Sequence, residues 1–513
     1  MLSKSQGGSN MLITEKYEKD ILGTLSCYDR VVVYATPGKL GYAGGMTNFF
    51  YQHEYKIFDF HKVFEPVTAA IKENAERIAD ENGLKIEYIR KTGAFRKEDR
   101  IQEIIAERGD HEGLVHIFSA LESSNTYKSW HNKDTGNTYF TPDTTKCLHY
   151  YFYFIDRLLG LCFFRVPTIA PFKASIYFNG HNLLEAKLKK KGITYEKTDN
   201  AFTFIGDFDE AQRLSDSIKV EDIHTAFDVF VSLYCPLPSE WDLRHNYTIR
   251  QVEYATDIVF KDAASLGPLY DNIIKTAMHT VTPIDVASFL SKKFSFRFEG
   301  EAGNKYGRRI LGTRIKHQMG EVSVKMYDKF GRVLRIEVTS NDVSQLKVFR
   351  EVTKKDGSTV NKVANAKKSI YSLHALTQVF KGAIRRYLEF VSSFDDPTDG
   401  LRKLERAVEP ATENGRNYKG FDFFAKEDSR ILQAAADGKF TLKGITNKEL
   451  RRLLPDKTPG QISRILKRLR LHGIIKKVGK TYKYYLTALG RQVIAAGLWY
   501  KNMMLVPSLS AYT

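Results

Sequence analysis

The pattern of apolar and polar positions predicts alternating strands and helices in residues 1–125. Apolar runs at Val31–Ala35 and Gly113–Ala120 indicate strands, and apolar residues at helical spacing indicate helices at 63–81 and 97–108. This alternation is typical of an α/β layer with some parallel pairing, so we expect an N-terminal α/β domain over 1–125. Ligands of such sheets bind beyond the carboxyl ends of strands, which draws attention to Asp29, Arg30, Ser119 and Glu122.

Residues 126–394 predict a central α+β domain with aromatic strands. The polar stretch 126–145 indicates a long loop, and the aromatic run 149–155 predicts a strand that pairs with 161–166 and is covered on both faces. Aromatic strands can stack unpaired bases, although core packing is the favoured interpretation here. A second hairpin is expected over 322–339, and residues 248–261 predict a helix.

Proline and glycine residues predict a linker over 395–424. The last domain, residues 425–513, follows it and has clear helix signals. Thr446 with Glu449, and Thr458 with Gln461, form capping-box patterns, and Pro459 suits a first helical position. The expected order is a helix at 427–436, a strand at 439–445, helices at 446–454 and 458–472, a hairpin at 474–478 and 482–486, and a last helix from 488.

Charge is concentrated in this last domain. The 513 residues contain 78 Lys and Arg against 60 Asp and Glu, a net charge of +18. Residues 441–501 contain fifteen basic and two acidic residues, so they hold +13 of it and leave +5 for the rest. Such a local surplus indicates a polyanionic partner, and nucleic acid is the expected one.

Composition excludes several other classes. The 42% apolar share is ordinary for a globular protein, and no apolar run approaches the length of a membrane span. The four cysteines are scattered and the first ten residues are polar, so we expect a cytoplasmic protein without a secretory signal or contact with a membrane.

The order of elements in 425–513, together with residues 461–478, resembles the winged helix-turn-helix of MarR-like regulators. In such modules the second helix enters the major groove and the wing contacts the DNA backbone. The resemblance implies that the nucleic-acid-binding residues are Gln461, Ser463, Arg464, Lys467, Arg468, Lys476, Lys477, Lys480 and Lys483. A basic face that is only solvated, or a protein-binding module, stays open as an alternative.

Several carboxylates are candidates for catalysis through bound Mg²⁺, the one cofactor that the sequence suggests. On the expected helix, Glu253 and Asp257 lie one turn apart, where they either share a metal or pair with Arg250 and Lys261. The complete candidate set is Asp156, Glu253, Asp257, Asp328 and Glu337.

The hairpin at 322–339 is similar to one in phage and plasmid replication initiators, on the residues Tyr327–Lys329 and Leu334–Glu337. Those enzymes often use a His-hydrophobic-His metal pair and a nucleophilic tyrosine. This chain has no such histidine pair, and nothing in the sequence selects between Tyr254 and Tyr327 as a nucleophile. The hairpin's cations, Lys325, Lys329, Arg332 and Arg335, are expected to contact a nucleic-acid backbone.

Residues 147–156, 178–182 and 325–331, followed by the same C-terminal module, also resemble a large uncharacterised prokaryotic family, which implies no activity. Three functions therefore remain open. The first is a DNA-processing protein of replication, recombination or a mobile element, as a nuclease or strand transferase if it is an enzyme. The second is a regulator with a large sensor or oligomerisation body, and the third is an RNA-binding ribonucleoprotein component. Homo-oligomerisation is left open.

Overall fold

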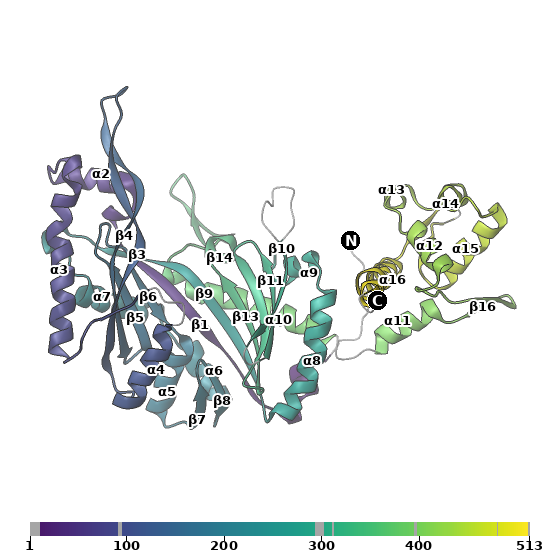
Figure 1. The fold of residues 1–513 in the computed structure, drawn as a ribbon, viewed down its shortest axis with the longest axis horizontal. Helices are drawn as coiled ribbons and strands as arrows, with labels where there is room; N and C mark the ends of the chain where they lie inside the picture. Colours follow the sequence, from purple (N-terminus) through teal and green to yellow (C-terminus); the bar gives the residue numbers. More distant parts are fainter. Residues whose placement is uncertain are drawn as a thin grey trace. The chain divides into compact units, whose positions relative to one another are not determined.

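The computed structural model divides the chain into two compact units, unit 1 (Met1–Asp395) and unit 2 (Asp396–Thr513) (Figure 1). The structure describes residues 11–90, 95–292, 302–309, 312–393, 398–479 and 481–510. The fold is mixed α/β with one large mixed sheet, which confirms the expected class at this level.

Unit 1 is built on a sheet of eleven strands in the order β10-β11-β12-β13-β9-β1-β6-β5-β4-β3-β2. The short β2 pairs with β3 in parallel, and the other neighbouring pairs are antiparallel. The bounds are β1 (Ile21–Pro37), β2 (Glu87–Tyr88), β3 (Gly113–His131), β4 (Thr138–Asp156), β5 (Gly160–Pro167), β6 (Ala174–Phe178), β9 (His245–Phe260), β10 (Ala302–Arg309), β11 (Gly312–Met319), β12 (Val322–Lys329) and β13 (Val333–Ser340).

Helices cover the two faces of this sheet unequally (Figure 1). On one face, buried residues such as Val31, Phe64, Phe227 and Phe380 join the sheet, α3, α7 and α10 in one core. On the other face, smaller clusters pack α5 and α6 against Leu25, and α4 against the end of the sheet that holds β3 and β4. The helix bounds are α1 (Ile13–Lys16), α2 (Ala43–Gln52), α3 (Phe60–Glu81), α4 (Lys97–Arg108), α5 (Gly180–Lys191), α6 (Phe208–Asp216), α7 (Val220–Tyr234), α8 (Ala263–Thr280), α9 (Pro283–Phe289) and α10 (Leu373–Ser392).

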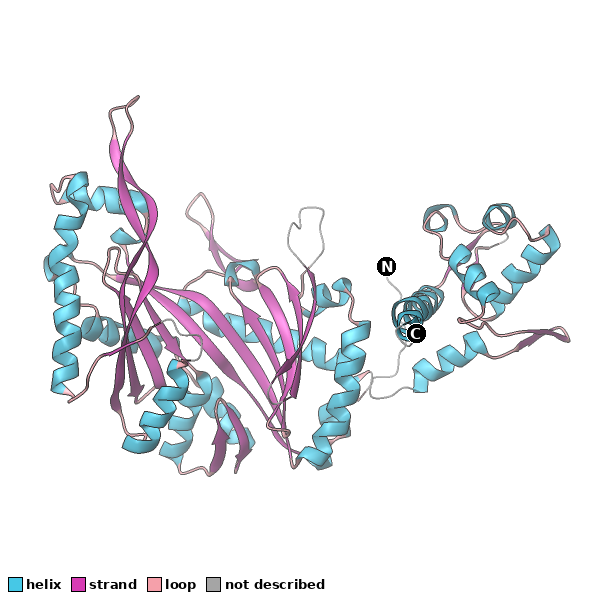
Figure 2. Ribbon diagram, viewed as in Figure 1, coloured by secondary structure: helices cyan, strands magenta, loops and turns pink. Residues whose placement is uncertain are grey.

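Two smaller hairpins complete unit 1 (Figure 2). They are β7 (Tyr195–Thr198) with β8 (Ala201–Ile205), and β14 (Lys347–Thr353) with β15 (Thr359–Asn365).

The expected helix at 248–261 is wrong, because these residues belong to the long strand β9. The segment is rich in β-branched and aromatic residues and pairs on both sides, with β1 and with β13, so tertiary pairing overrides the helical pattern. The expected loop at 126–145 is also wrong. It forms the far ends of β3 and β4, where Trp130 lies opposite Tyr139 and Asn132 begins the turn.

The domain boundaries also differ from those expected. The boundary at 125/126 falls inside β3, and β1 pairs with β6 and β9, so residues 1–125 and 126–394 share one sheet. Within the expected linker, α11 (Thr398–Val408), β16 (Ala411–Glu413) and β17 (Arg416–Tyr418) are ordered elements of unit 2. The residues of the expected linker from 395 to 397 lie outside the described residues.

The element boundaries of unit 2 mostly match the capping and turn signals of its sequence. Its other elements are α12 (Lys426–Ala435), α13 (Phe440–Lys443), α14 (Asn447–Leu453), α15 (Pro459–Leu471), β18 (Ile475–Lys477), β19 (Tyr484–Leu486), α16 (Ala488–Trp499), a π-helix (Tyr500–Leu505) and α17 (Val506–Ser510). Thr458 and Gln461 cap α15 reciprocally. The expected strand at 439–445 is instead the short α13, and only Ile445 makes a bridge, to Tyr484.

None of the helices in the described ranges combines the length and the apolar character that a membrane span requires.

Candidate functional site

A fully buried arginine, Arg335 on β13, is the centre of an ionic cluster in unit 1. Its Nε and Nη2 donate to the two carboxylate oxygens of Asp257, each at 2.6 Å, and its Nη1 donates to Asp29 Oδ1 at 3.1 Å. Nη2 also donates to the Asn200 carbonyl at 2.6 Å and lies 3.0 Å from His181 Nε2. Arginine presents its donors in a planar fork, and this cluster uses all three nitrogens of that fork.

Distant parts of the chain bring these partners together. Asp29 is an extra residue in β1, because Tyr28 is opposite Tyr254 and Arg30 is opposite Glu253. Such a bulge redirects a side chain, and here it turns Asp29 toward Arg335. The first residue of α5 crosses the bulge closely, since a Cβ on Gly180 would lie 2.2 Å from the Tyr28 carbonyl oxygen.

Burial and charge act in opposite directions on the two aspartates. Burial by itself raises the pKa of a carboxyl group, but Arg335 and His181 outweigh it. The pKa of Asp257 is lowered to about 2, and that of Asp29 is also lowered. Both groups are therefore carboxylates at neutral pH, held by a cation that has no access to water.

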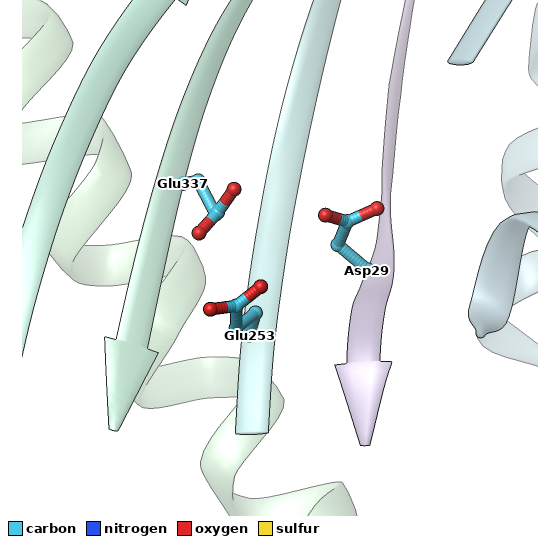
Figure 3. Close-up of side chains that lie close together, drawn as sticks. All are labelled: Asp29, Glu253 and Glu337. Atoms are coloured by element: carbon cyan, nitrogen blue, oxygen red, sulfur yellow. The ribbon is translucent and has the colours of Figure 1, made fainter. Parts of the chain in front are cut away.

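A second group of charges borders the first (Figure 3). Carboxylate oxygens of Asp29, Glu253 and Glu337 lie within 4.8 Å of one another. Lys325 Nζ lies 2.6 Å from Glu337 and 3.3 Å from Glu253, and the Tyr327 hydroxyl donates to Glu337 at 2.7 Å. Burial, and then the neighbouring Glu337, raise the pKa of Glu253.

These three carboxylates are the chemical type that Mg²⁺ prefers, and they are the one such group among the described residues. However, the Lys325 ammonium already lies between Glu253 and Glu337. A divalent ion at this position would have to displace it, so the geometry is that of an ion pair formed across three strands.

The structure brings together two of the five predicted carboxylates, Glu253 and Glu337, and places Asp257 in the adjoining Arg335 cluster. The other two lie elsewhere. Asp156 accepts hydrogen bonds from the backbone N–H groups of Leu158 and Leu159 in the turn after β4. Asp328 lies between Tyr327 and Lys329 on β12 and so faces the opposite side of the sheet.

The two candidate tyrosines also lie on opposite faces of the sheet. Tyr327 contacts Glu337, whereas Tyr254 packs between Tyr28 and Phe380 on the opposite face. Burial raises the pKa of both hydroxyls, so both hold their protons at neutral pH.

Sequence reasoning missed His181 and placed Arg335 wrongly on a nucleic-acid-contacting surface. Arg335 is buried, and Lys329 is nearly so, with bonds to Asn200 and Asp199. Alternation along β12 and β13 could have placed Lys325, Lys329 and Arg335 on one face, but it does not say whether that face is covered.

In unit 2, the predicted contact residues divide into two groups. Arg468 is not on an open surface, because its guanidinium pairs with both oxygens of Asp428 at 2.7 Å and donates to two backbone carbonyls. Lys467 pairs with Glu413 at 2.9 Å. The side chains of Gln461, Ser463, Arg464, Lys476, Lys477 and Lys483 are exposed, and Lys480 lies outside the described residues.

Comparisons with family models, with curated proteins and with solved structures find no match to this chain.

Proposed function

We propose that the chain is a nucleic-acid-binding protein that docks duplex DNA through α15 and the β18–β19 hairpin of unit 2. The order of α14, a turn, α15 and the hairpin β18–β19 resembles a winged helix-turn-helix, with Ile445 adding a bridge to the hairpin. In that arrangement the amino-terminal half of α15 faces the major groove and the hairpin lies against the backbone.

The observation that carries the proposal is the difference between paired and unpaired cations in this unit. Lys467, Arg468 and Arg470 are held in ion pairs with Glu413 and Asp428. Within the described ranges of unit 2, no carboxylate pairs with the exposed cations Arg464, Lys476, Lys477 and Lys483. They extend from α15 to the hairpin, as a phosphate-contacting surface requires.

Duplex binding by single-residue variants tests the proposal. Binding of the full chain to a fluorescein-labelled duplex is measured by anisotropy across salt concentrations. Arg464→Ala should weaken binding by about 1–3 kcal/mol if the side chain reads a base. The double variant Lys476→Ala/Lys477→Ala should weaken binding to all sequences and reduce the salt slope by about 1 per lysine.

Lys426→Ala is the matched control, because Lys426 is also an exposed cation of unit 2 but lies on α12. It should bind as the unchanged protein does. If Arg464→Ala and the double variant both bind duplex as tightly as Lys426→Ala, the proposal is wrong. If they lose binding to structured RNA but not to DNA, the RNA-binding alternative takes its place.

A further inference from the structure

One face of the large sheet in unit 1 is covered only in part. The helices α3, α7 and α10 lie against one face, whereas α4, α5 and α6 cover only one end of the other (Figure 1). The rest of this second face, which we call the open face, consists of β10 to β12 and the parts of β13, β9, β1 and β6 outside the buried Arg335 cluster. Lys325, which pairs with Glu253 and Glu337, lies on this face.

On one side of the open face, lysines form a cross-strand row. Lys305 on β10 is opposite Lys316 on β11, which is opposite Lys325 on β12. Like charges directly opposite one another destabilise a sheet. Burial and the neighbouring cations Lys325, Lys305 and Arg314 lower the pKa of Lys316.

Lys305 and Lys316 have no ion pair with a carboxylate in the described part of the chain. Lys325 differs, since it pairs with both Glu253 and Glu337. The row therefore holds two cations whose mutual repulsion an incoming polyanion would relieve.

On the other side of the open face, cations lie over aromatic rings. The Lys173 ammonium is 3.9 Å from the ring centre of Tyr34, and the Arg30 guanidinium is 5.5 Å from that of Tyr177. Arg30 is exposed, and Tyr34 and Tyr177 are partly exposed. Tyr177 is also stacked on Phe163, with ring centres 5.0 Å apart.

We propose that the open face binds single-stranded nucleic acid, with phosphates on Lys305, Lys316 and Arg30 and with unpaired bases against Tyr34 and Tyr177. A basic surface interleaved with aromatic rings is how proteins hold single strands without reading their sequence. Lys305 and Lys316, on β10 and β11, lie four to six strand spacings across the sheet from Tyr34 on β1 and Tyr177 on β6, about 19–29 Å at the usual spacing. A strand of a few nucleotides spans that distance. The inference extends the proposed function, in which unit 2 docks duplex.

The test uses the full chain and two fluorescein-labelled oligonucleotides, dT20 and rU20, in anisotropy titrations across salt concentrations. Lys316→Ala and Arg30→Ala should each weaken binding several-fold and reduce the salt slope by about 0.7. Tyr34→Leu should weaken binding about five-fold or more, because a stacked base is lost, and should leave the salt slope unchanged.

Lys72→Ala is the matched control, since Lys72 is an exposed cation on α3, which covers the opposite face. It should bind as the unchanged protein does, and thermal melting should show that all four variants are folded. Whether the open-face variants weaken binding to dT20 alone, to rU20 alone or to both identifies the sugar that the face accepts. If the unchanged protein binds neither oligonucleotide, or if the three open-face variants bind like Lys72→Ala, the inference is wrong.

The variant Arg464→Ala separates this inference from the proposed function. It should bind duplex more weakly and keep its affinity for dT20. If Arg464→Ala and Lys476→Ala/Lys477→Ala both keep duplex binding, the role of unit 2 fails while the oligonucleotide titrations still decide the role of the open face.

Discussion

Replacing Arg335 by methionine tests the ionic cluster most directly. Methionine keeps much of the side-chain volume but removes every donor, which leaves Asp257 and Asp29 as buried carboxylates that are 1% and 4% exposed. Removing one partner of a buried ion pair costs about 3–5 kcal/mol, because the remaining charge has lost both its partner and its water. Domains of ordinary stability have only about 5–15 kcal/mol to lose.

The assay is urea unfolding followed by tryptophan fluorescence. The chain has two compact units, so one signal from the whole protein would mix two transitions. Two of the three tryptophans, Trp130 and Trp241, lie in unit 1, and Trp499 lies in unit 2. A Trp499→Phe background therefore reports on unit 1 alone.

Arg77→Met provides the control on an exposed ion pair. Arg77 pairs with Glu81 one turn away on α3, and both side chains are 56% exposed. Such a pair contributes about 0.3–0.5 kcal/mol, so the two variants should differ by several kcal/mol. Adding Asp257→Asn to Arg335→Met should recover part of the loss, because it removes one of the two buried carboxylates that have lost Arg335 and leaves His181 to pair with Asp29 alone. If Arg335→Met costs no more than Arg77→Met, the cluster does not stabilise unit 1 as we argue.

Two other predictions follow from the same region. The lowered pKa values of Asp29 and Asp257 stabilise the folded state above the unfolded-state pKa of about 3.9, and this stabilisation is lost as the pH falls toward the folded-state value, about 2 for Asp257. The urea midpoint of unit 1 should decrease as the pH is lowered from about 6 to about 3. The decrease should be less steep in Arg335→Met, because burial there disfavours the charged carboxylates and acid removes that charge. Equal slopes in the two proteins would contradict the assignment. Gly180→Ala should destabilise unit 1 by about 1–3 kcal/mol, because the new Cβ meets the Tyr28 carbonyl. Gly267→Ala on α8, where no atom lies within 4 Å of the new Cβ, should stabilise unit 1 by about 0.5–1 kcal/mol. Similar melting temperatures for the two variants would show that the β1 bulge can move.

The C-terminal elements could be predicted from the sequence because their signals are local. A capping pair such as Thr458 with Gln461 fixes a helix start within four residues, and Gly473, with φ of +72°, ends the same helix where a left-handed residue is needed. The concentration of charge in 441–501 is likewise a property of the chain, and no packing is needed to see it.

The sheet of unit 1 was predicted less well, because strand pairing depends on segments far apart. The strands at 31–35 and 161–166 and the hairpin at 322–339 were predicted from alternation and β-branched residues, and the structure confirms them. The segment 248–261 was wrongly predicted as a helix, because its apolar spacing fits a helix as well as a strand. Only its pairing with β1 and β13 in the fold makes it a strand. Glu253 and Asp257 therefore appeared as neighbours on a helix, whereas Asp257 pairs with Arg335 on the neighbouring β13 and Glu253 pairs with Lys325 on β12, two strands away.

The sequence by itself determined the separate basic module, its helices and the polar, aromatic character of the strands, because these depend on composition and on contacts within a few residues. Only the tertiary structure decided that Arg335, expected at a surface, is buried among Asp29, Asp257 and His181. The bulge at Asp29 and the pairing of β9 between β1 and β13 bring these residues together, across separations of 78 to 306 positions. No local pattern encodes such a meeting, since burial depends on which strands become neighbours.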